Sequence, residues 1–265
     1  MREGKRSKLK RYASKVITIV CIGIIIYAAY GLIDICKDYY QNQQVTNDVR
    51  ETFHEAASAE KKERDKGDKH APNRSVRPEF IELLDQNPDV VGWIAIDDTN
   101  IDYPIVQSQN NTDYLTQDFN KNESSAGSIF MDFRNHIESL GRNTIIYGHR
   151  MKDGSMFKHL TKFLDRDFFT NHRTFDFDTL YDSYNAEIFA VYNTTTDFNY
   201  IQTDFDSDED FEQLLADIRN ESLYETDVDV DTDDQIITLS TCDYELDEDE
   251  GRLVVQAKLT KKEKG

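Results

Sequence analysis

Apolar residues form one long run near the N-terminus and short segments elsewhere. The run Val16–Ile33 holds no charged residue, and a helix of that length spans about 27 Å, close to the thickness of the hydrocarbon core of a bilayer. Seven basic residues and one acidic residue precede the run, which favours a cytoplasmic N-terminus. The small pair Ala28-Ala29 makes a poor signal-peptidase site. The pattern predicts a basic cytoplasmic arm at 1–15 and an uncleaved, single-pass transmembrane signal-anchor at 16–35, with the rest of the chain outside the cell.

The next segment is polar and thinly apolar. From Lys37 to about Lys66 the chain lacks Gly and Pro, which is typical of a solvated helical stalk. Pro72 and several bases within Gly67–Arg77 indicate a flexible joint. We therefore expect a polar stalk and linker over 36–77 and a folded extracytoplasmic domain over 78–261, which begins with a short amphipathic helix at a favourable Pro.

Short β-strand patterns dominate the predicted domain. We expect strands at 92–96, 101–106, 127–132, 143–147, 174–177, 184–192, 235–242 and 252–259. Helical spacing occurs at 155–170 and at Asp208–Asn220, and the acids at the start of the second stretch suit a helix N-terminus. A helical turn is expected at Asn111–Gln117. Many short strands with a few helices predict a mostly antiparallel β-barrel.

Charge separates the chain into a basic arm and an acidic body. The formal net charge is −20; the first fifteen residues carry a net +6, which leaves −26 for the remaining residues. Such a body repels nucleic acid, so neither DNA nor RNA is an expected partner. Most of these acids are interpreted as a solvated surface.

Cysteine usage directs attention to one residue. Cys21 lies inside the apolar run and Cys36 at its edge, so neither is expected to bridge to the folded domain. Cys242 is then a lone thiol in an extracytoplasmic domain, where unpaired cysteines usually pair or serve a function. We expect no metal site and no cofactor, because no Cys cluster or HxxxH pair occurs and the acidic run Glu225–Asp234 lacks the Gly-punctuated loop of an EF-hand.

The strand pattern places Cys242 beside a cation. Two strands, Gln235–Cys242 and Arg252–Leu259, flank a nine-residue loop rich in carboxylates. Alternation along the first strand directs Ser240 and Cys242 away from its apolar face. If the strands pair antiparallel, Arg252 lies at the same end of the sheet as Cys242. A strand-end thiol beside a guanidinium is a plausible nucleophile with an oxyanion partner.

His149 is the expected partner of that thiol among the six histidines. It follows the apolar strand 143–147 and Gly148, and it precedes a polar turn. Catalytic groups are often mounted at such strand ends. His54 and His70 lie outside the predicted domain, and the other three are expected to be solvated or structural.

Several motifs together resemble the sortases of class B. These are TLSTC at Thr238–Cys242, an Arg ten residues later at Arg252, and YGHRMKDGSMF at Tyr147–Phe157. The stretches GSIFMDFRN at Gly127–Asn135 and VGWIAIDDTNIDYPIVQ before it are also similar to that class. The resemblance runs from about Pro78 to Lys258, with the motifs in matching order and spacing. The helix predicted at Asp208–Asn220 is similar to the class B insertion before the last two strands.

This resemblance implies a fold, a reaction and roles for individual residues. It implies a closed eight-stranded barrel that cleaves the C-terminal sorting signal of surface proteins and transfers the acyl part to a peptidoglycan amine of a Gram-positive cell wall. By motif, Cys242 is the nucleophile, His149 the general acid/base, and Arg252 the group that orients substrate and stabilises the oxyanion. The residues implied to line the substrate groove are Ser240, Thr241, Asn111 and Leu115.

Other classes of protein share some of these features. A membrane-anchored cysteine peptidase or hydrolase acting on cell-wall peptides would also use Cys and His, but it usually mounts the Cys at a helix start beside a Gly- or Trp-rich signature that is absent here. A peptidoglycan L,D-transpeptidase has a Cys motif quite unlike TLSTC. A membrane-tethered binding module would need no Cys–His–Arg set at all.

Overall fold

The structure is a computed structural model that describes residues 3–64, 75–244, 246–247 and 249–263. The chain divides into two compact units, Met1–Gln43 and Gln44–Gly265. Helix α1 (Glu3–Arg64) supplies the first unit and continues into the second. By length and composition this helix is able to cross a membrane, and its apolar side chains from Val16 to Ile35 are exposed.

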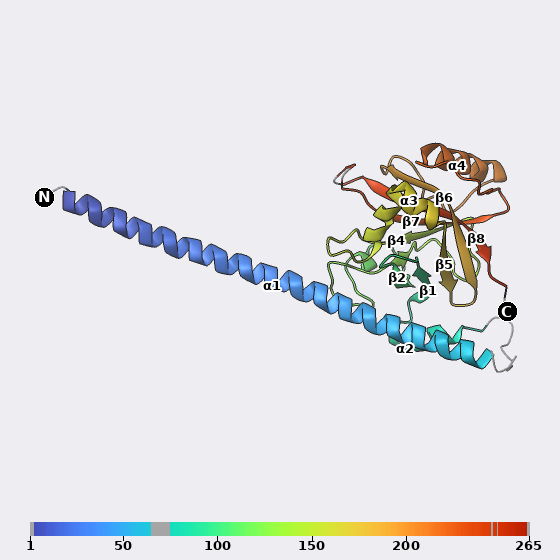
Figure 1. Cartoon of the computed structure of the whole chain (residues 1–265), viewed down its shortest axis with the longest axis horizontal. Coiled ribbons are helices and arrows are strands. Elements are labelled where there is room, and N and C mark those ends of the chain that lie inside the picture. Colours follow the sequence, from blue (N-terminus) through green and yellow to red (C-terminus); the bar gives the residue numbers. More distant parts are fainter. Residues whose placement is uncertain (1–2, 65–74, 245, 248, 264–265) are drawn as a thin grey trace. The chain divides into compact units, whose positions relative to one another are not determined.

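The second unit is built on a closed barrel of eight strands (Figure 1). The strands are β1 (Val90–Ala95), β2 (Asp102–Val106), β3 (Phe130–Met131), β4 (Asn143–Tyr147), β5 (Thr174–Thr179), β6 (Ser183–Thr194), β7 (Gln235–Cys242) and β8 (Arg252–Lys261). Their order around the barrel is β1-β2-β3-β4-β7-β8-β6-β5. The pairs β2–β3 and β4–β7 are parallel and the other pairs antiparallel. The predicted mostly antiparallel, eight-stranded barrel is therefore confirmed.

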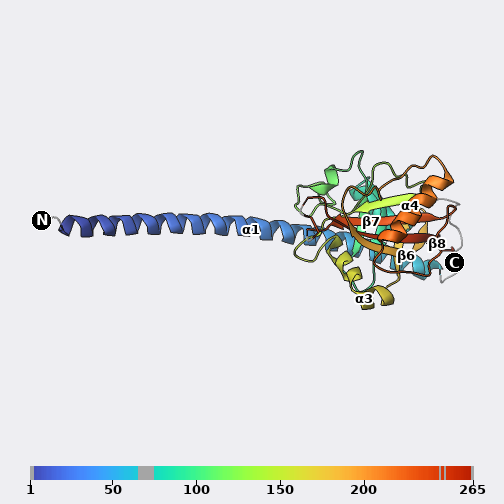
Figure 2. The same ribbon diagram turned by 90° about the horizontal axis from the view of Figure 1, so that it is seen from above.

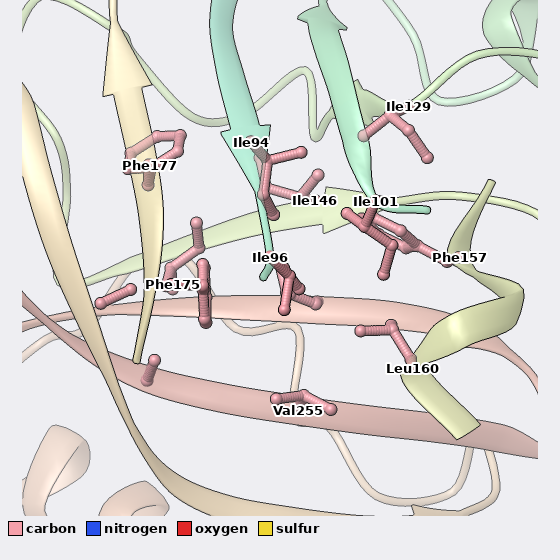
Figure 3. Close-up of a cluster of buried hydrophobic side chains, with 14 of the residues drawn as sticks. Ile94, Ile96, Ile101, Ile129, Ile146, Phe157, Leu160, Phe175, Phe177 and Val255 are labelled. Carbon is pink, nitrogen blue, oxygen red and sulfur yellow. The ribbon is translucent and has the colours of Figure 1, made fainter. Parts of the chain in front are cut away.

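Alternating apolar positions fill the inside of the barrel. Figure 3 shows isoleucines in or next to several strands gathered with Phe175, Phe177 and Val255 around this interior. Phe157 and Leu160, from the 3-10 helix η2 (Phe157–Leu164), close one side of the cluster. A buried Ile or Phe side chain contributes roughly 1.5–3 kcal/mol to folding, so this interior is the main stabilising element of the barrel.

Short helices lie before and between the strands and pack on the barrel. They are α2 (Pro78–Gln86), η1 (Asp113–Leu115), η2, α3 (Arg166–Asn171) and α4 (Asp208–Glu221). The side chain of Ser207 caps α4 by accepting from the backbone N–H of Asp210. The apolar stripe of α4 packs on Tyr192, Ile236 and Val254, so α4 lies across β6, β7 and β8 (Figure 2). The outer face of β7 is thus buried along most of its length.

The single helix expected at 155–170 is two helices in the structure. A 3-10 helix ends at Leu164 and α3 begins at Arg166. Asp165 lies between them in an extended conformation, and its side chain accepts a hydrogen bond from the backbone N–H of Phe168. This cap starts a new helix and ends the earlier one, a local effect that apolar spacing alone does not report.

The end of α1, from Gln44 onward, belongs to the second compact unit. Val49 and Phe53 are buried, and the Phe53 ring stacks on Trp93 with centroids 4.0 Å apart. Val49 and Phe53 are separated by one helical turn, so they form a narrow apolar stripe that the polar composition of the segment conceals. Most of the predicted joint, at 67–74, lies outside the described residues.

Replacing Phe53 by Ala should therefore destabilise the barrel. Truncating a buried Phe typically costs about 3–5 kcal/mol, and we expect a loss near the lower value because the stack lies at the edge of the unit. Denaturant unfolding of the full chain in detergent measures it. Ile81→Ala on the exposed face of α2 is the control, expected to change stability by less than about 0.5 kcal/mol. Equal midpoints for Phe53→Ala and the parent would mean that this part of α1 is only a tether.

Candidate active site

Strand pairing brings three segments of the chain to one end of the barrel. The parallel pair β4–β7 aligns Tyr147 with Ser240, and the antiparallel pair β7–β8 places Cys242 directly opposite Arg252. One further hydrogen bond, from Gly148 N to the Ser240 carbonyl at 3.3 Å, extends the β4–β7 pairing toward His149. The end of β4, the end of β7 and the start of β8 therefore meet at the same edge.

A groove of about 220 Å³ lies at this edge. Its lining residues are Asn111, Leu115, Phe130, Tyr147, Gly148, His149, Ser240, Thr241, Cys242 and Arg252. All seven site residues named from the sequence are among them. The other three, Phe130, Tyr147 and Gly148, were not singled out, although they lie inside the motifs that carry the resemblance. A larger hollow of about 1110 Å³, which includes Tyr181 and Lys261, contains neither a Cys nor a His and is not assigned to this chemistry.

The His149 ring is anchored to the opposite wall of the groove. Its Nε2 lies 2.8 Å from the carbonyl oxygen of Leu115. Because a carbonyl only accepts, Nε2 carries the hydrogen. The backbone carbonyl of His149 in turn accepts from Phe157 N at 2.9 Å, which ties the residue to η2. His149 is thus held in the groove at both its ring and its backbone.

The Arg252 guanidinium is oriented by the backbone beside it. Its Nη1 donates to the carbonyl of Gly251 at 2.8 Å and to that of Asp249 at 3.1 Å. Among the residues that the structure describes, no carboxylate forms an ion pair with Arg252. Its positive charge is therefore directed to the groove and not neutralised by the acidic side chains described around it.

A buried ion pair joins the loop after His149 to the loop after Cys242. Arg150 Nη1 lies 2.6 Å from Asp243 Oδ1, and both side chains are largely buried. Asp243 is therefore a structural member of the acidic loop and not part of its solvated surface. The charge complementarity of the two residues that directly follow His149 and Cys242 was visible in the sequence, but only the fold shows that they meet.

Two tyrosines approach the same strand end. Burial raises the pKa of Tyr200, whose hydroxyl lies 2.9 Å from the Ser240 hydroxyl. Partial burial and the neighbouring Cys242 raise the pKa of Tyr244. Thr241 Oγ1 is buried without a hydrogen-bond partner among the described residues. Within that same described part of the chain, no group of three or more His, Cys, Asp or Glu side chains is arranged to hold a metal ion.

Comparison with known proteins agrees with the motifs. The family model described as Sortase domain matches residues 94–260. Sortase B of Listeria monocytogenes is 42% identical over 255 residues, which cover 96% of this chain and 100% of that protein. Sortase B of Staphylococcus aureus is 37% identical and covers 96% of this chain and 99% of its own length.

Solved structures show the same likeness. Sortase B of Bacillus anthracis in complex with AAEK1 is 46% identical, with a TM-score of 0.74 over 86% of this chain and 100% of that one. A Staphylococcus aureus sortase B–substrate complex is 38% identical, with a TM-score of 0.76 over 86% of this chain and 100% of that one.

Substitution of Gly148 tests how tightly the start of the His149 segment is packed. An added Cβ would lie 2.4 Å from Ile129 Cδ1 and 2.9 Å from the Phe157 ring. Overpacking of this kind costs about 1–3 kcal/mol, so Gly148→Ala should lower the free energy of unfolding by that amount. Gly141, just before β4, is the matched control, because its nearest neighbour would be 3.9 Å away. Equal losses in both variants would show that backbone freedom, and not space, makes Gly148 necessary.

Proposed function

The chain belongs to the sortase family, as a member of class B, and we propose that the groove at the end of β7 is its active site. The protein is a cysteine transpeptidase that cleaves the C-terminal sorting signal of surface proteins and links the acyl product to a cell-wall amine. Membership of class B favours this activity over the alternative, a cysteine peptidase or hydrolase that acts on cell-wall peptides. The single observation that supports the placement of the site is that Cys242, His149 and Arg252 line one groove.

In the proposed first step, the Cys242 thiolate attacks the carbonyl carbon before the scissile bond. A thioester forms, the C–N bond breaks, and the departing amine takes a proton from the His149 imidazolium, which becomes neutral. In the second step an acceptor amine attacks the thioester and returns a proton to His149, while Cys242 leaves as the thiolate. The role of His149 is supported by its place in the same groove as Cys242 and by the bond of its Nε2 to the Leu115 carbonyl, which holds the ring there.

Arg252 is proposed to stabilise the charge that develops on the carbonyl oxygen. It lies directly across the strand pair from Cys242, and two backbone carbonyls hold one of its nitrogens. The remaining donors of the guanidinium are then presented to the groove without further reorganisation, which is the property that makes an oxyanion partner effective. Ser240, Thr241, Asn111 and Leu115 are proposed to contact the sorting peptide, since all four line the same groove.

The proposed topology follows from α1. We propose that 16–35 crosses the cell membrane once, with the arm 1–15 in the cytoplasm and the catalytic domain at the cell surface. Support comes from the exposed apolar side chains of this segment and from the bases before it. The acceptor is proposed to be the amine of a peptidoglycan precursor or cross-bridge.

The nucleophile is tested by Cys242→Ala. The change removes one sulfur atom from a strand end, so the fold should be kept while cleavage of a fluorogenic sorting peptide falls to background. A peptide library screened with the full chain supplies the substrate, and circular dichroism checks the fold. Cys36→Ala, which changes a cysteine in the other unit, should leave the rate unaltered. Residual cleavage by the Cys242 variant would remove Cys242 from the mechanism.

Arg252→Lys tests whether the planar guanidinium is needed. Lysine keeps the charge but cannot hold two backbone carbonyls and still present an oriented fork. Loss of one oxyanion donor typically lowers kcat on the order of 100-fold or more, and a fall of that size is expected here. Arg173→Lys, at a surface pair with exposed Asp227, is the control and should keep full activity. A near-parental rate for Arg252→Lys would leave Arg252 with a structural role.

Membrane topology is tested in intact cells. An N-terminal tag should resist added protease while the catalytic domain is digested, and the protein should stay in the membrane fraction with its N-terminus unprocessed. Release of a protein that begins between Ala28 and Asp34 would overturn the signal-anchor assignment.

A further inference from the structure

A buried carboxylate lies behind the groove, one residue after β3. Asp132 has no exposed surface. Its Oδ1 accepts from Arg134 Nε at 2.8 Å, and its Oδ2 accepts from Arg134 Nη2 and Asn111 Nδ2 at 2.8 Å and from the Tyr147 hydroxyl at 2.9 Å. Asn111 and Tyr147 line the groove, whereas Asp132 does not. The carboxylate therefore contacts the wall of the groove from behind.

Asp132 is charged at neutral pH despite its burial. Burial alone would raise the pKa of Asp132, but the hydrogen bonds from Arg134, Asn111 and Tyr147 outweigh it and hold that pKa below its ordinary value. Burial and the Asp132 charge together raise the pKa of Tyr147, which keeps its hydroxyl a donor. The cluster thus contains one carboxylate that is ionised at neutral pH and three residues that donate hydrogen bonds to it.

The carboxylate determines which way the Asn111 amide faces. An ionised carboxylate only accepts hydrogen bonds, so the NH₂ group of Asn111 must point toward it. On the other side, Asn111 Oδ1 accepts from Phe133 N at 3.0 Å. A flipped amide would set its oxygen against the carboxylate and its NH₂ against the Phe133 N–H, and would lose both bonds. The second N–H of the Asn111 amide and the second lone pair of its oxygen therefore remain available to the groove, each at a fixed position.

Arg134 connects the same cluster to the segment between β6 and α4. Its Nη2 also donates to the carbonyl of Ile201 at 3.0 Å, in the segment between β6 and α4. Asn143 fixes this segment as well, by donating to the carbonyls of Tyr200 and Gln202 at 3.1 and 3.0 Å. The Asp132 cluster and Asn143 therefore hold the same segment by hydrogen bonds to three successive carbonyls.

We propose that Asp132 is a positioning residue that sets the orientation of the Asn111 amide and thereby the binding of the sorting peptide. An oriented amide offers one donor and one acceptor, a pair that is complementary to a backbone peptide unit or a carboxamide side chain. Asp132 does not touch the reacting atoms. The inference rests on the proposed function of the groove. In it, Asp132 determines where the Asn111 side chain presents its N–H donor and where it presents its oxygen acceptor.

The first test is Asp132→Asn, which keeps the size of the side chain and removes its charge. An amide at 132 accepts at one atom only and presents its own NH₂ to the donors, so the orientation of Asn111 then depends on the Phe133 N–H alone. We expect kcat/KM for a cognate fluorogenic peptide to fall on the order of 10- to 100-fold, with KM carrying the loss and kcat little changed, as for weakened ground-state binding. Alkylation of Cys242 by iodoacetamide should keep its rate and its pH profile.

A double-mutant cycle shows whether Asp132 acts through Asn111. If it does, Asp132→Asn adds little to the loss of kcat/KM caused by Asn111→Ala, whereas independent effects multiply. Tyr147→Phe serves if Asp132→Asn does not fold, because the missing hydroxyl has Asp132 as its partner. It should raise KM several-fold in the parent and hardly at all on the Asn111→Ala background.

Asp118→Asn is the matched control. Asp118 is also a buried carboxylate, but it accepts from the backbone and side chain of Asn122 and does not line the groove. It should lower thermal stability and leave KM unchanged. The positioning role would be overturned by an unchanged KM in both Asp132→Asn and Tyr147→Phe, or by losses of kcat/KM that multiply with that of Asn111→Ala. Cleavage of the peptide by the parent chain would show that the proposed function still holds in that case. A parent chain that cleaves no sorting peptide would overturn the proposed function and this inference with it.

Discussion

The hydrogen-bond register of β7 with its two neighbours is the constraint on which the active site depends. β4 runs parallel to β7 and β8 runs antiparallel to it, so the end of one strand and the start of the other meet at Cys242. A slip of one residue in either pair would turn Cys242 or Arg252 to the opposite face of the sheet. The apolar residues on the inner face of β7 and β8 prevent this slip, because it would expose them. Burial of the barrel core thus fixes the relative positions of Cys242 and Arg252 at the strand ends.

Buried polar groups hold the loops and the wall of the groove that the strand register brings together. The ion pair of Arg150 with Asp243 connects the two loops that carry His149 and Cys242, and the Asp132 cluster holds the wall that contains Asn111. An unpaired charge in such a place would cost several kcal/mol, so each of these groups keeps its partner in position. The groove is therefore lined by side chains whose own supports are buried, which suits a site that must bind a peptide in one orientation.

Much of this arrangement could be predicted from the sequence, and the reasons are local. Alternation along β7 and β8 predicted that Cys242 and Arg252 lie at the same end of the sheet, because the inner positions of both strands are apolar. The strand expected at 127–132 shrinks to Phe130–Met131, since Gly127 has a positive φ and Ser128 N bonds to the carbonyl of Tyr114. The roles of Asp132 and Arg150 could not be predicted, because their partners are distant in sequence and meet only through the barrel.

The most direct measurement is to locate the acyl group on the enzyme. The full chain is mixed with a cognate sorting peptide in the absence of an acceptor amine, quenched in acid, digested and analysed by mass spectrometry. The account predicts an adduct on Cys242 with the mass of the peptide upstream of the scissile bond, and loss of the adduct when an amine is added. Turnover with the acyl group on any other residue, or turnover without an acyl-enzyme, would contradict it.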